Sequence, residues 1–149
     1  MNAVVDLKLP NSQVRRHPER GSYDRESAYP ILDAGQIAHV GFTVEGQPYV
    51  IPMLYVRMDD LIYLHGSVGS RLLKHLTGGH PCCLTVTHVD GLVLARSHFS
   101  HSVNYRSVAV FGHARALSDL AHKGRVLACM VDALIPGRAA DGRPGIKAS

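Results

Sequence analysis

The sequence predicts a mainly β protein with a few peripheral helices, folded as a small antiparallel barrel that closes its own edges. Apolar segments of strand length are separated by short turns, which favours hairpins and antiparallel neighbours. Roughly five to seven such segments are expected, against two or three helices. The chain has 149 residues, 46% hydrophobic and 19% charged, which is the size of one domain with its own core.

The chain divides into an arm, a domain and a tail. We expect residues 1–22 to form an N-terminal arm, because prolines and glycine interrupt them and they have little periodicity. Residues 23–137 form the folded domain. Residues 138–149 are a polar tail, rich in Gly and Pro, that cannot supply a strand by itself. A closing strand is therefore missing or comes from elsewhere.

The first half of the domain is predicted to be a helix, three strands and a second helix. Asp24 is an acceptable N-cap for a helix that ends before Gly35, and Pro30 should break or kink it. Strands are predicted over 38–44, 49–58 and 61–65, with turns at 45–48 and 59–60. From Ser67 to Gly78-Gly79, apolar residues recur at helical spacing; they are Val68, Leu72, Leu73 and Leu76.

The second half is predicted to be a hairpin, a strand and a helix. Segments 82–89 and 92–97 should pair around Asp90-Gly91, because Asp-Gly is a strong hairpin signal. Segment 107–117 resumes as a strand, in which Gly112 permits a bulge or bend. Ser118 then caps a helix that Pro136-Gly137 stops. Its apolar residues share one face; they are Leu120, Leu127, Met130, Val131 and Leu134.

Charge and composition narrow the classes of partner. Lys and Arg outnumber Asp and Glu by 16 to 12, a formal net charge of +4, which favours an anionic partner. The basic residues are scattered, Trp is absent and the aromatic residues are dispersed, so we discount nucleic acid and favour a phosphorylated small molecule.

The location of the protein follows from its cysteines and its apolar runs. Three cysteines without framework spacing and a polar N-terminus predict a reduced, cytoplasmic protein. No apolar run approaches the ~20 residues that span a bilayer, so no membrane association is expected.

The segment from His65 to Lys74 is the most informative for function. It is a strand that ends in small residues at the start of a helix, where free backbone N–H groups and hydroxyls suit a phosphate. Arg71 can bind a phosphate through two hydrogen bonds, and Lys74 can act as a point charge. The alternative is a capped amphipathic helix with solvated basic residues.

Two further segments are candidates for ligand binding, each with an ordinary alternative. Strand 49–55 carries Pro52, which belongs at an edge or bulge, where free backbone groups can bind the rim of a planar heterocycle. The alternative is an ordinary edge strand. Segment 102–107 gathers hydroxyl, amide, phenol and guanidinium groups, either as a ligand rim or as a loop of caps and turns. The histidines and cysteines lack metal-ligand spacing, so no metal site is expected.

Five segments, in matching order and spacing, carry a resemblance to a known family. They are residues 16–26 (RHPERGSYDRE), 46–52 (GQPYVIP), 63–67 (YLHGS), 90–97 (DGLVLARS) and 101–108 (HSVNYRSV). The chain, from about Arg15 onward, resembles the pyridoxamine-5'-phosphate-oxidase-like flavin-binding proteins, in the branch that includes nitroimidazole-resistance reductases.

The resemblance implies a split β-barrel that binds FMN at the interface of a homodimer. The edge strand would face the isoalloxazine through Val50, Ile51, Pro52 and Met53. The phosphate would be held by Ser67, Ser70, Arg71 and Lys74. The partner subunit would contribute Asn104, Tyr105, Arg106 and Ser107. His65, with Gly66, would lie near the ring, as a proton donor to the substrate or as a structural residue.

The sequence departs from the family at two places. Relatives that bind phosphate through a Ser-Arg-Lys run have a lysine where this chain has Leu72, which puts more weight on Arg71 and Lys74. Family members also continue into further strands, whereas this chain stops at Ser149. We therefore expect either that the tail is shortened relative to the family, or that the barrel is incomplete and depends more on dimerisation.

The function implied by the resemblance is that of an FMN-dependent oxidoreductase. Electrons would pass from a reduced nicotinamide or another donor to a small electrophile, such as a nitroaromatic or pyridoxal-like compound. The flavin would carry the redox chemistry while the protein supplies orientation, electrostatics and access. The alternative is a non-catalytic flavin-binding carrier or sensor.

Overall fold

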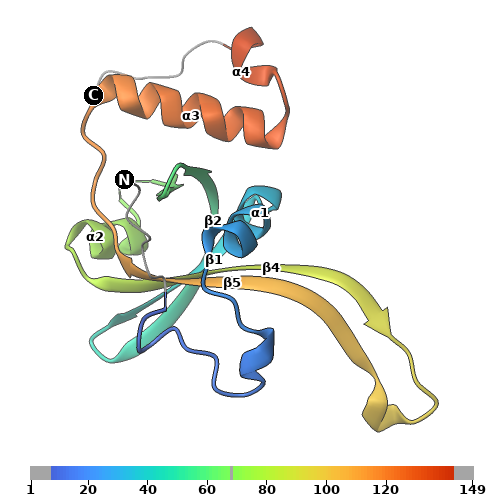
Figure 1. Cartoon of the computed structure of the whole chain (residues 1–149). Coiled ribbons are helices and arrows are strands. Elements are labelled where there is room, and N and C mark those ends of the chain that lie inside the picture. The colour runs from blue at the N-terminus through green and yellow to red at the C-terminus, as the bar shows by residue number, and fades with distance from the viewer. Residues whose placement is uncertain (1–7, 68, 143–149) are drawn as a thin grey trace, which may run out of the picture.

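The computed structural model describes residues 8–67 and 69–142, and these build one five-stranded antiparallel sheet with helices around it (Figure 1). The strand order is β3-β2-β1-β4-β5. The strands are β1 (Ile37–Val44), β2 (Gln47–Met58), β3 (Leu61–Leu64), β4 (Pro81–Val93) and β5 (Ser102–His113). The helices are α1 (Arg25–Ala34), α2 (Arg71–Thr77), α3 (Leu120–Leu134) and α4 (Arg138–Asp141), with 3-10 turns at Pro18–Arg20 and His98–Ser100.

The predicted mainly β class with peripheral helices is confirmed, but the sheet is not closed. β3 and β5 are its two edges and do not pair with each other. The expectation that the barrel closes its own edges is therefore wrong. The reason is that β3 has only four residues, while the far end of β4 and β5 runs away from the body rather than curling back toward β3 (Figure 1). The described tail, up to residue 142, adds a helix and no strand.

Two tight turns precede β3; the second is at 59–60 as predicted, and the first is at Glu45 and Gly46, because Gln47 and Pro48 of the predicted turn already belong to β2. Glu45 and Gly46 have φ of 50° and 80°, the left-handed pair that a two-residue hairpin requires. The second turn, at Asp59 and Asp60, joins Met58 to its cross-strand partner Leu61. These turns fix the register of the first three strands.

The predicted hairpin at Asp90-Gly91 is wrong. β4 continues to Val93, and the register shifts between Val89 and Gly91, which marks a bulge. The Asp90 carboxylate accepts two hydrogen bonds of 2.9 Å from Arg106 on β5, and these hold its pKa below the usual value. Because Asp-Gly also suits a bulge, the cross-strand pairing decides which structure forms. The chain instead reverses through residues 94–101.

Three smaller predictions about the elements are corrected. β5 begins at Ser102 rather than 107 and ends at His113, and Gly112 pairs in regular register with Cys82. The N-cap of α3 is Asp119, whose carboxylate accepts from the His122 N–H, and not Ser118. α1 continues through Pro30, which is exposed, so the proline does not break the helix. Val68 lies outside the described residues.

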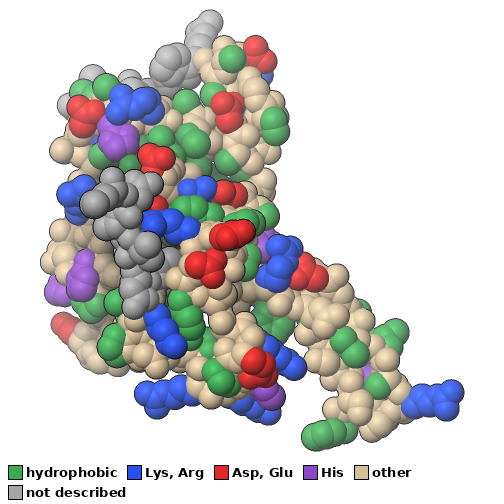
Figure 2. Space-filling model, in the orientation of Figure 1, with side chains coloured by type: hydrophobic (Ala, Val, Ile, Leu, Met, Phe, Trp, Pro, Cys, Tyr) green, Lys and Arg blue, Asp and Glu red, His purple; other side chains and the backbone are tan. Residues whose placement is uncertain are grey.

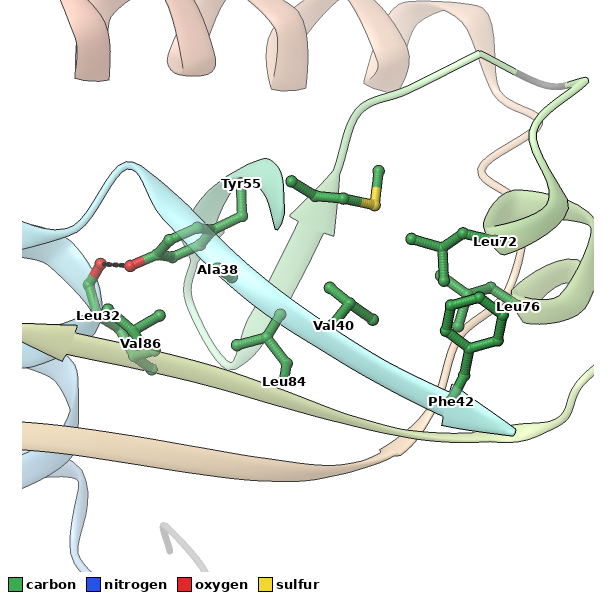
Figure 3. Packing of buried hydrophobic residues seen from close by; sticks show 10 residues of the cluster. Leu32, Ala38, Val40, Phe42, Tyr55, Leu72, Leu76, Leu84 and Val86 are labelled. Carbon is green, nitrogen blue, oxygen red and sulfur yellow. Dashed lines mark hydrogen bonds between the residues drawn. The ribbon is translucent and has the colours of Figure 1, made fainter. Parts of the chain in front are cut away.

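The main core lies between the inner face of the sheet and helices α1 and α2 (Figure 3). Beside α1, the Tyr55 hydroxyl donates to the Leu32 carbonyl, and burial raises the pKa of Tyr55 to about 12. A side chain at Gly35 would overlap that hydroxyl, so glycine is required there for close packing. Beside α2, Phe42 packs next to Leu72 and Leu76, each of which is only 2% exposed.

A second apolar cluster attaches α3 to β2. It consists of Val56, Val126 and Met130, and the Tyr63 hydroxyl lies 3.0 Å from Nε2 of His122. None of the helices in residues 8–67 and 69–142 has the length and apolar character needed to span a bilayer.

The opposite face of the sheet carries exposed apolar side chains. Residues that pair directly across two strands share a face, so Val89 lies beside Tyr105 and Leu92 beside Val103. Val89 is 67% exposed, Leu92 71% and Tyr105 63%. Figure 2 shows apolar side chains exposed along this projecting end of β4 and β5, which we call the ribbon (residues 88–106). A two-stranded ribbon of this kind is only marginally stable without a partner.

Candidate functional site

A cavity of about 270 Å³ lies between β2, the end of β3 and the start of α2. It is lined by Ile51, Pro52, Met53, Leu54, His65, Gly66, Ser67, Ser70, Arg71 and Leu72. The structure therefore brings together three of the four predicted ring-facing residues with five of the predicted residues around the helix start.

The cavity is next to a strand edge that has no ladder partner. β3 pairs only with Tyr55–Met58 of β2, and the His65 N–H adds one bond of 3.3 Å to the Leu54 carbonyl. Within the described strands, residues 47–53 of β2 pair with β1 alone. Pro52 is thus at an edge, as predicted, and the neighbouring backbone groups remain free for a ligand.

Glycine allows the segment after β3 to approach this edge closely. A Cβ on Gly66 would come within 3.0 Å of the Met53 methyl carbon and 3.6 Å of Leu73 Cδ1. Met53 is only 9% exposed and belongs both to the core and to the cavity lining. It supplies an apolar wall against which a planar ring can pack.

The start of α2 places a hydroxyl and a guanidinium at the cavity. The Ser70 hydroxyl oxygen caps the helix by accepting from the Leu73 N–H at 3.2 Å, and its own hydrogen stays available to a ligand. Leu72 is buried in the core, which explains why this position is apolar in this chain. Arg71 and Lys74 on the same helix are exposed.

Arg71 is the best-placed cation for an anionic ligand. It lines the cavity, and its Cζ lies 4.8 Å from the centroid of the Tyr49 ring. Neither Arg71 nor Lys74 takes part in the ion pairs found among the described residues, so both charges are available. Lys74 does not line the cavity and can act on a ligand only at its margin.

His65 lies at the end of β3, is exposed, and also lines the cavity. No hydrogen-bond partner of its ring is found in the part of the chain that the structure describes. The ring nitrogens are therefore available to hydrogen-bond with a molecule in the cavity.

Besides Lys74, five predicted site residues do not line the cavity of their own chain. Val50 is 66% exposed and lies on the outer face of the sheet. Asn104, Tyr105, Arg106 and Ser107 lie on or beside the ribbon, on strand β5 rather than in a loop. The Arg106 guanidinium is already bound to Asp90. Within one chain these residues do not contribute to the cavity beside β2.

Two lining residues and one neighbour were not predicted. Leu54 follows Met53 on the same apolar strand, and this continuity of the strand could have indicated it as a lining residue. Leu72 directly follows Arg71 in the sequence. The position of Tyr49 against Arg71 depends on how α2 folds back onto β2, which no local pattern reports.

In a second cavity, the charged side chains are already paired with each other. A space of about 190 Å³ between α1, β2 and α3 is lined by Arg57 and Asp33, which are bound to each other through two hydrogen bonds. Across residues 8–67 and 69–142, no group of three or more His, Cys, Asp or Glu residues is arranged to hold a metal ion.

The comparisons with known proteins agree with this arrangement. The family model for pyridoxamine 5'-phosphate oxidase matches residues 24–148. Among solved structures, the chain is similar to the flavocytochrome Anf3 from Azotobacter vinelandii, with 41% identity over 94% of this chain and a TM-score of 0.84. It is also similar to the FAD and heme binding protein from Mycobacterium smegmatis, with 37% identity over 85% of this chain and a TM-score of 0.77.

A third solved structure is more distant. It is described as a 5-nitroimidazole antibiotic resistance protein from Bacteroides thetaiotaomicron, with 26% identity over 75% of this chain and 67% of that chain, and a TM-score of 0.63. The chain spans 64% and 61% of the first two structures. The comparison with curated proteins found no match.

Fold and site together define the class. The antiparallel sheet with its unclosed edge is the split-barrel architecture of these neighbours, and the cavity beside β2 is suited to a small anionic molecule. The chain belongs to the pyridoxamine 5'-phosphate oxidase family. The resemblance drawn from five sequence segments is confirmed.

Proposed function

We propose that this protein binds FMN in the cavity beside β2 and uses it as an oxidoreductase. The observation that carries the proposal is the position of Arg71 at an apolar cavity with a free strand edge, where its guanidinium has no ion-pair partner among the described residues. Two of the similar structures are a flavocytochrome and a protein that binds FAD and heme, which supports a flavin as the ligand. We take FMN because its terminal phosphate suits Arg71 and Lys74.

The residues present fit a flavin in chemical type. Ile51, Met53 and Leu54 provide apolar surface for the isoalloxazine, and the free edge of β2 offers backbone donors and acceptors to its polar rim. Arg71 would bind the phosphate through two N–H groups, with Ser67 and Ser70 as further donors. When bound, FMN supplies the electron and hydride transfer that protein side chains cannot perform.

The role of the protein in the reaction is to orient the ligands and to handle a proton. Backbone N–H groups at the β2 edge would stabilise negative charge on the ring when it is reduced. His65 is accessible beside the cavity and would donate a proton to a small electrophilic acceptor, such as a nitroaromatic or pyridoxal-like compound. The alternative function is a flavin-binding carrier or sensor without a substrate.

One chain covers only part of such a ligand, which favours a homodimer. The cavity of about 270 Å³ lies below the usual range of roughly 300–1,000 Å³ for small-molecule sites and is open to solvent on one side. The ribbon presents an exposed apolar face, so a second copy would cover it and bring Asn104 to Ser107 to the partner's cavity. Two-fold symmetry makes such an exchange reciprocal.

The phosphate assignment is tested by FMN titration of variants. Arg71→Ala should raise the Kd for FMN about ten-fold or more, because a hydrogen-bonded charge pair contributes about 1.5–3 kcal/mol. Lys74→Ala should raise it less, because Lys74 lies outside the cavity. Lys123→Ala, which removes an exposed cation on α3, is the matched control and should leave the Kd unchanged. Flavin fluorescence quenching measures all four proteins.

Two results of that titration would contradict the proposal. If the unmodified protein binds neither FMN nor FAD, the flavin assignment fails. If Arg71→Ala binds FMN as tightly as the unmodified protein does, the phosphate lies elsewhere. If the protein binds FAD more tightly than FMN, the flavin assignment stands and the cofactor is FAD.

Enzyme and carrier are separated by following the flavin absorbance. In an oxidoreductase, NADH or NADPH should bleach the bound flavin, and a nitroaromatic or pyridoxal-like acceptor should restore it over repeated cycles. His65→Gln should then slow reoxidation per bound flavin, because the proton donor is lost. Bound flavin that no donor reduces, or that no acceptor reoxidises faster than oxygen does, would favour the carrier.

The dimer is tested by placing a charge on the ribbon. Leu92→Glu should convert a dimer into a monomer and weaken FMN binding, because a carboxylate would be buried in an apolar interface. Leu120→Glu, at an exposed leucine on α3, is the control and should remain dimeric. Analytical ultracentrifugation gives the masses, and an unmodified protein that is monomeric at all concentrations would refute this part of the proposal.

A further inference from the structure

A series of ring contacts, two of them stacked and one tilted, leads from His80 to Tyr49 and ends on Arg71, which lines the cavity. The Arg71 Cζ lies 4.8 Å from the Tyr49 ring centroid, and the Tyr49 and Phe42 rings are stacked at 5.3 Å with 21° between their planes. The Phe42 ring contacts the His75 ring at 5.1 Å, and His75 stacks on His80 at 4.5 Å.

Helix α2 contacts the Tyr49–Phe42 pair at both of its ends, through Arg71 and His75, and of these four residues Arg71 lines the cavity. Arg71 and His75 are four residues apart and therefore lie on the same face of the helix. Arg71 covers Tyr49 from β2, and His75 covers Phe42 from β1. The helix face and the two strands thus enclose one aromatic pair.

Tyr49 is held through its ring rather than through its hydroxyl. Phe42, on which it stacks, is 5% exposed and packs beside Leu72 and Leu76 of α2 (Figure 3). Among residues 8–67 and 69–142, no hydrogen-bond partner of the Tyr49 hydroxyl is found. The Tyr49 side chain therefore interacts with Arg71 through the face of its aromatic ring.

An aromatic partner suits a guanidinium that must bind an anion. A carboxylate partner would occupy the N–H groups of Arg71 and would compete with a phosphate for them. Arg106 has such a partner, because its guanidinium is bound by the Asp90 carboxylate. An aromatic face attracts the guanidinium from one side and leaves the N–H donors in its plane free. Holding the long side chain in place beforehand also reduces the conformational entropy lost when the ligand binds.

We propose that Tyr49, braced by Phe42 and His75, is a positioning residue that holds Arg71 at the cavity mouth and raises affinity for the phosphate of the ligand. The proposal deepens the proposed function, because the ligand that it assumes is a flavin phosphate. Tyr49 acts through Arg71 and does not itself need to touch the phosphate.

The first test compares a flavin with and without phosphate. Tyr49→Leu should weaken FMN binding about two- to five-fold, the size expected for loss of one exposed cation–π contact. Tyr49→Phe keeps the π-face and should bind FMN like the unmodified protein. Riboflavin, which lacks the phosphate, should bind to all three proteins with equal affinity.

A double-mutant cycle tests whether Tyr49 acts through Arg71. Tyr49→Leu should have no further effect on FMN binding in an Arg71→Ala background, because the side chain that it positions is already absent. Equal weakening of FMN and riboflavin, or full additivity with Arg71→Ala, would overturn the proposal and indicate a general packing role.

A ligand-free measurement separates this proposal from the proposed function. The ring current of Tyr49 should shift the Arg71 side-chain protons upfield in the NMR spectrum of the unmodified protein, and Tyr49→Leu should abolish the shift. If the shift is present and no flavin binds, the positioning stands and the flavin assignment fails. If Arg71 has unshifted side-chain protons in the unmodified protein, the positioning itself is refuted.

Discussion

The site depends on the shortness of β3. Four residues of β3 pair with the last four of β2, and the strand then stops, so the preceding part of β2 has an unpaired edge. An exposed edge normally invites pairing with another chain. Here Pro52 removes one donor, and the segment after β3 turns over the edge, with Gly66 allowing it to approach Met53. The gap that remains between edge and segment is the cavity.

Helix α2 completes the cavity, because one of its faces packs on the sheet and another borders the cavity. Leu72 and Leu76 are buried, and their packing against Phe42 fixes α2 on the sheet. Because those positions face inward, Arg71 is turned to the cavity and is left without a carboxylate partner among the described residues. The charge that we propose as the ligand's partner is thus positioned by apolar contacts and by one aromatic ring, neither of which neutralises it.

Local signals in the sequence predicted most of the elements. The turn at Glu45 and Gly46 and the cap at Asp24 depend on a few adjacent residues, and both were predicted correctly. The Asp90-Gly91 signal predicts a hairpin where the structure has a bulge, because the same dipeptide favours a turn or a bulge and only the pairing with β5 selects between them. The predicted closure of the sheet is wrong because closure depends on where distant strands run.

The candidate site could also be predicted only in part, because some of its residues are close in the sequence and others meet only through the fold. His65 to Arg71 are nearly contiguous in the sequence, and the edge strand was marked by Pro52, so their meeting at one cavity could be anticipated. Val50 was assigned to the ring, yet strand alternation puts it on the outer face, opposite to Ile51 and Met53. The contact of Tyr49 with Arg71 arises only when α2 packs on the sheet.

The most direct test of the central claim is an NMR titration of protein labelled at the methionine methyl groups. Met53 lines the cavity, whereas Met58 and Met130 belong to the cluster beneath α3. If FMN binds beside β2, its ring should shift the Met53 methyl signal strongly and leave the signals of the other two nearly unchanged. An unmoved Met53 signal at saturating FMN, or larger shifts at Met58 and Met130, would contradict the assignment of this cavity as the flavin site.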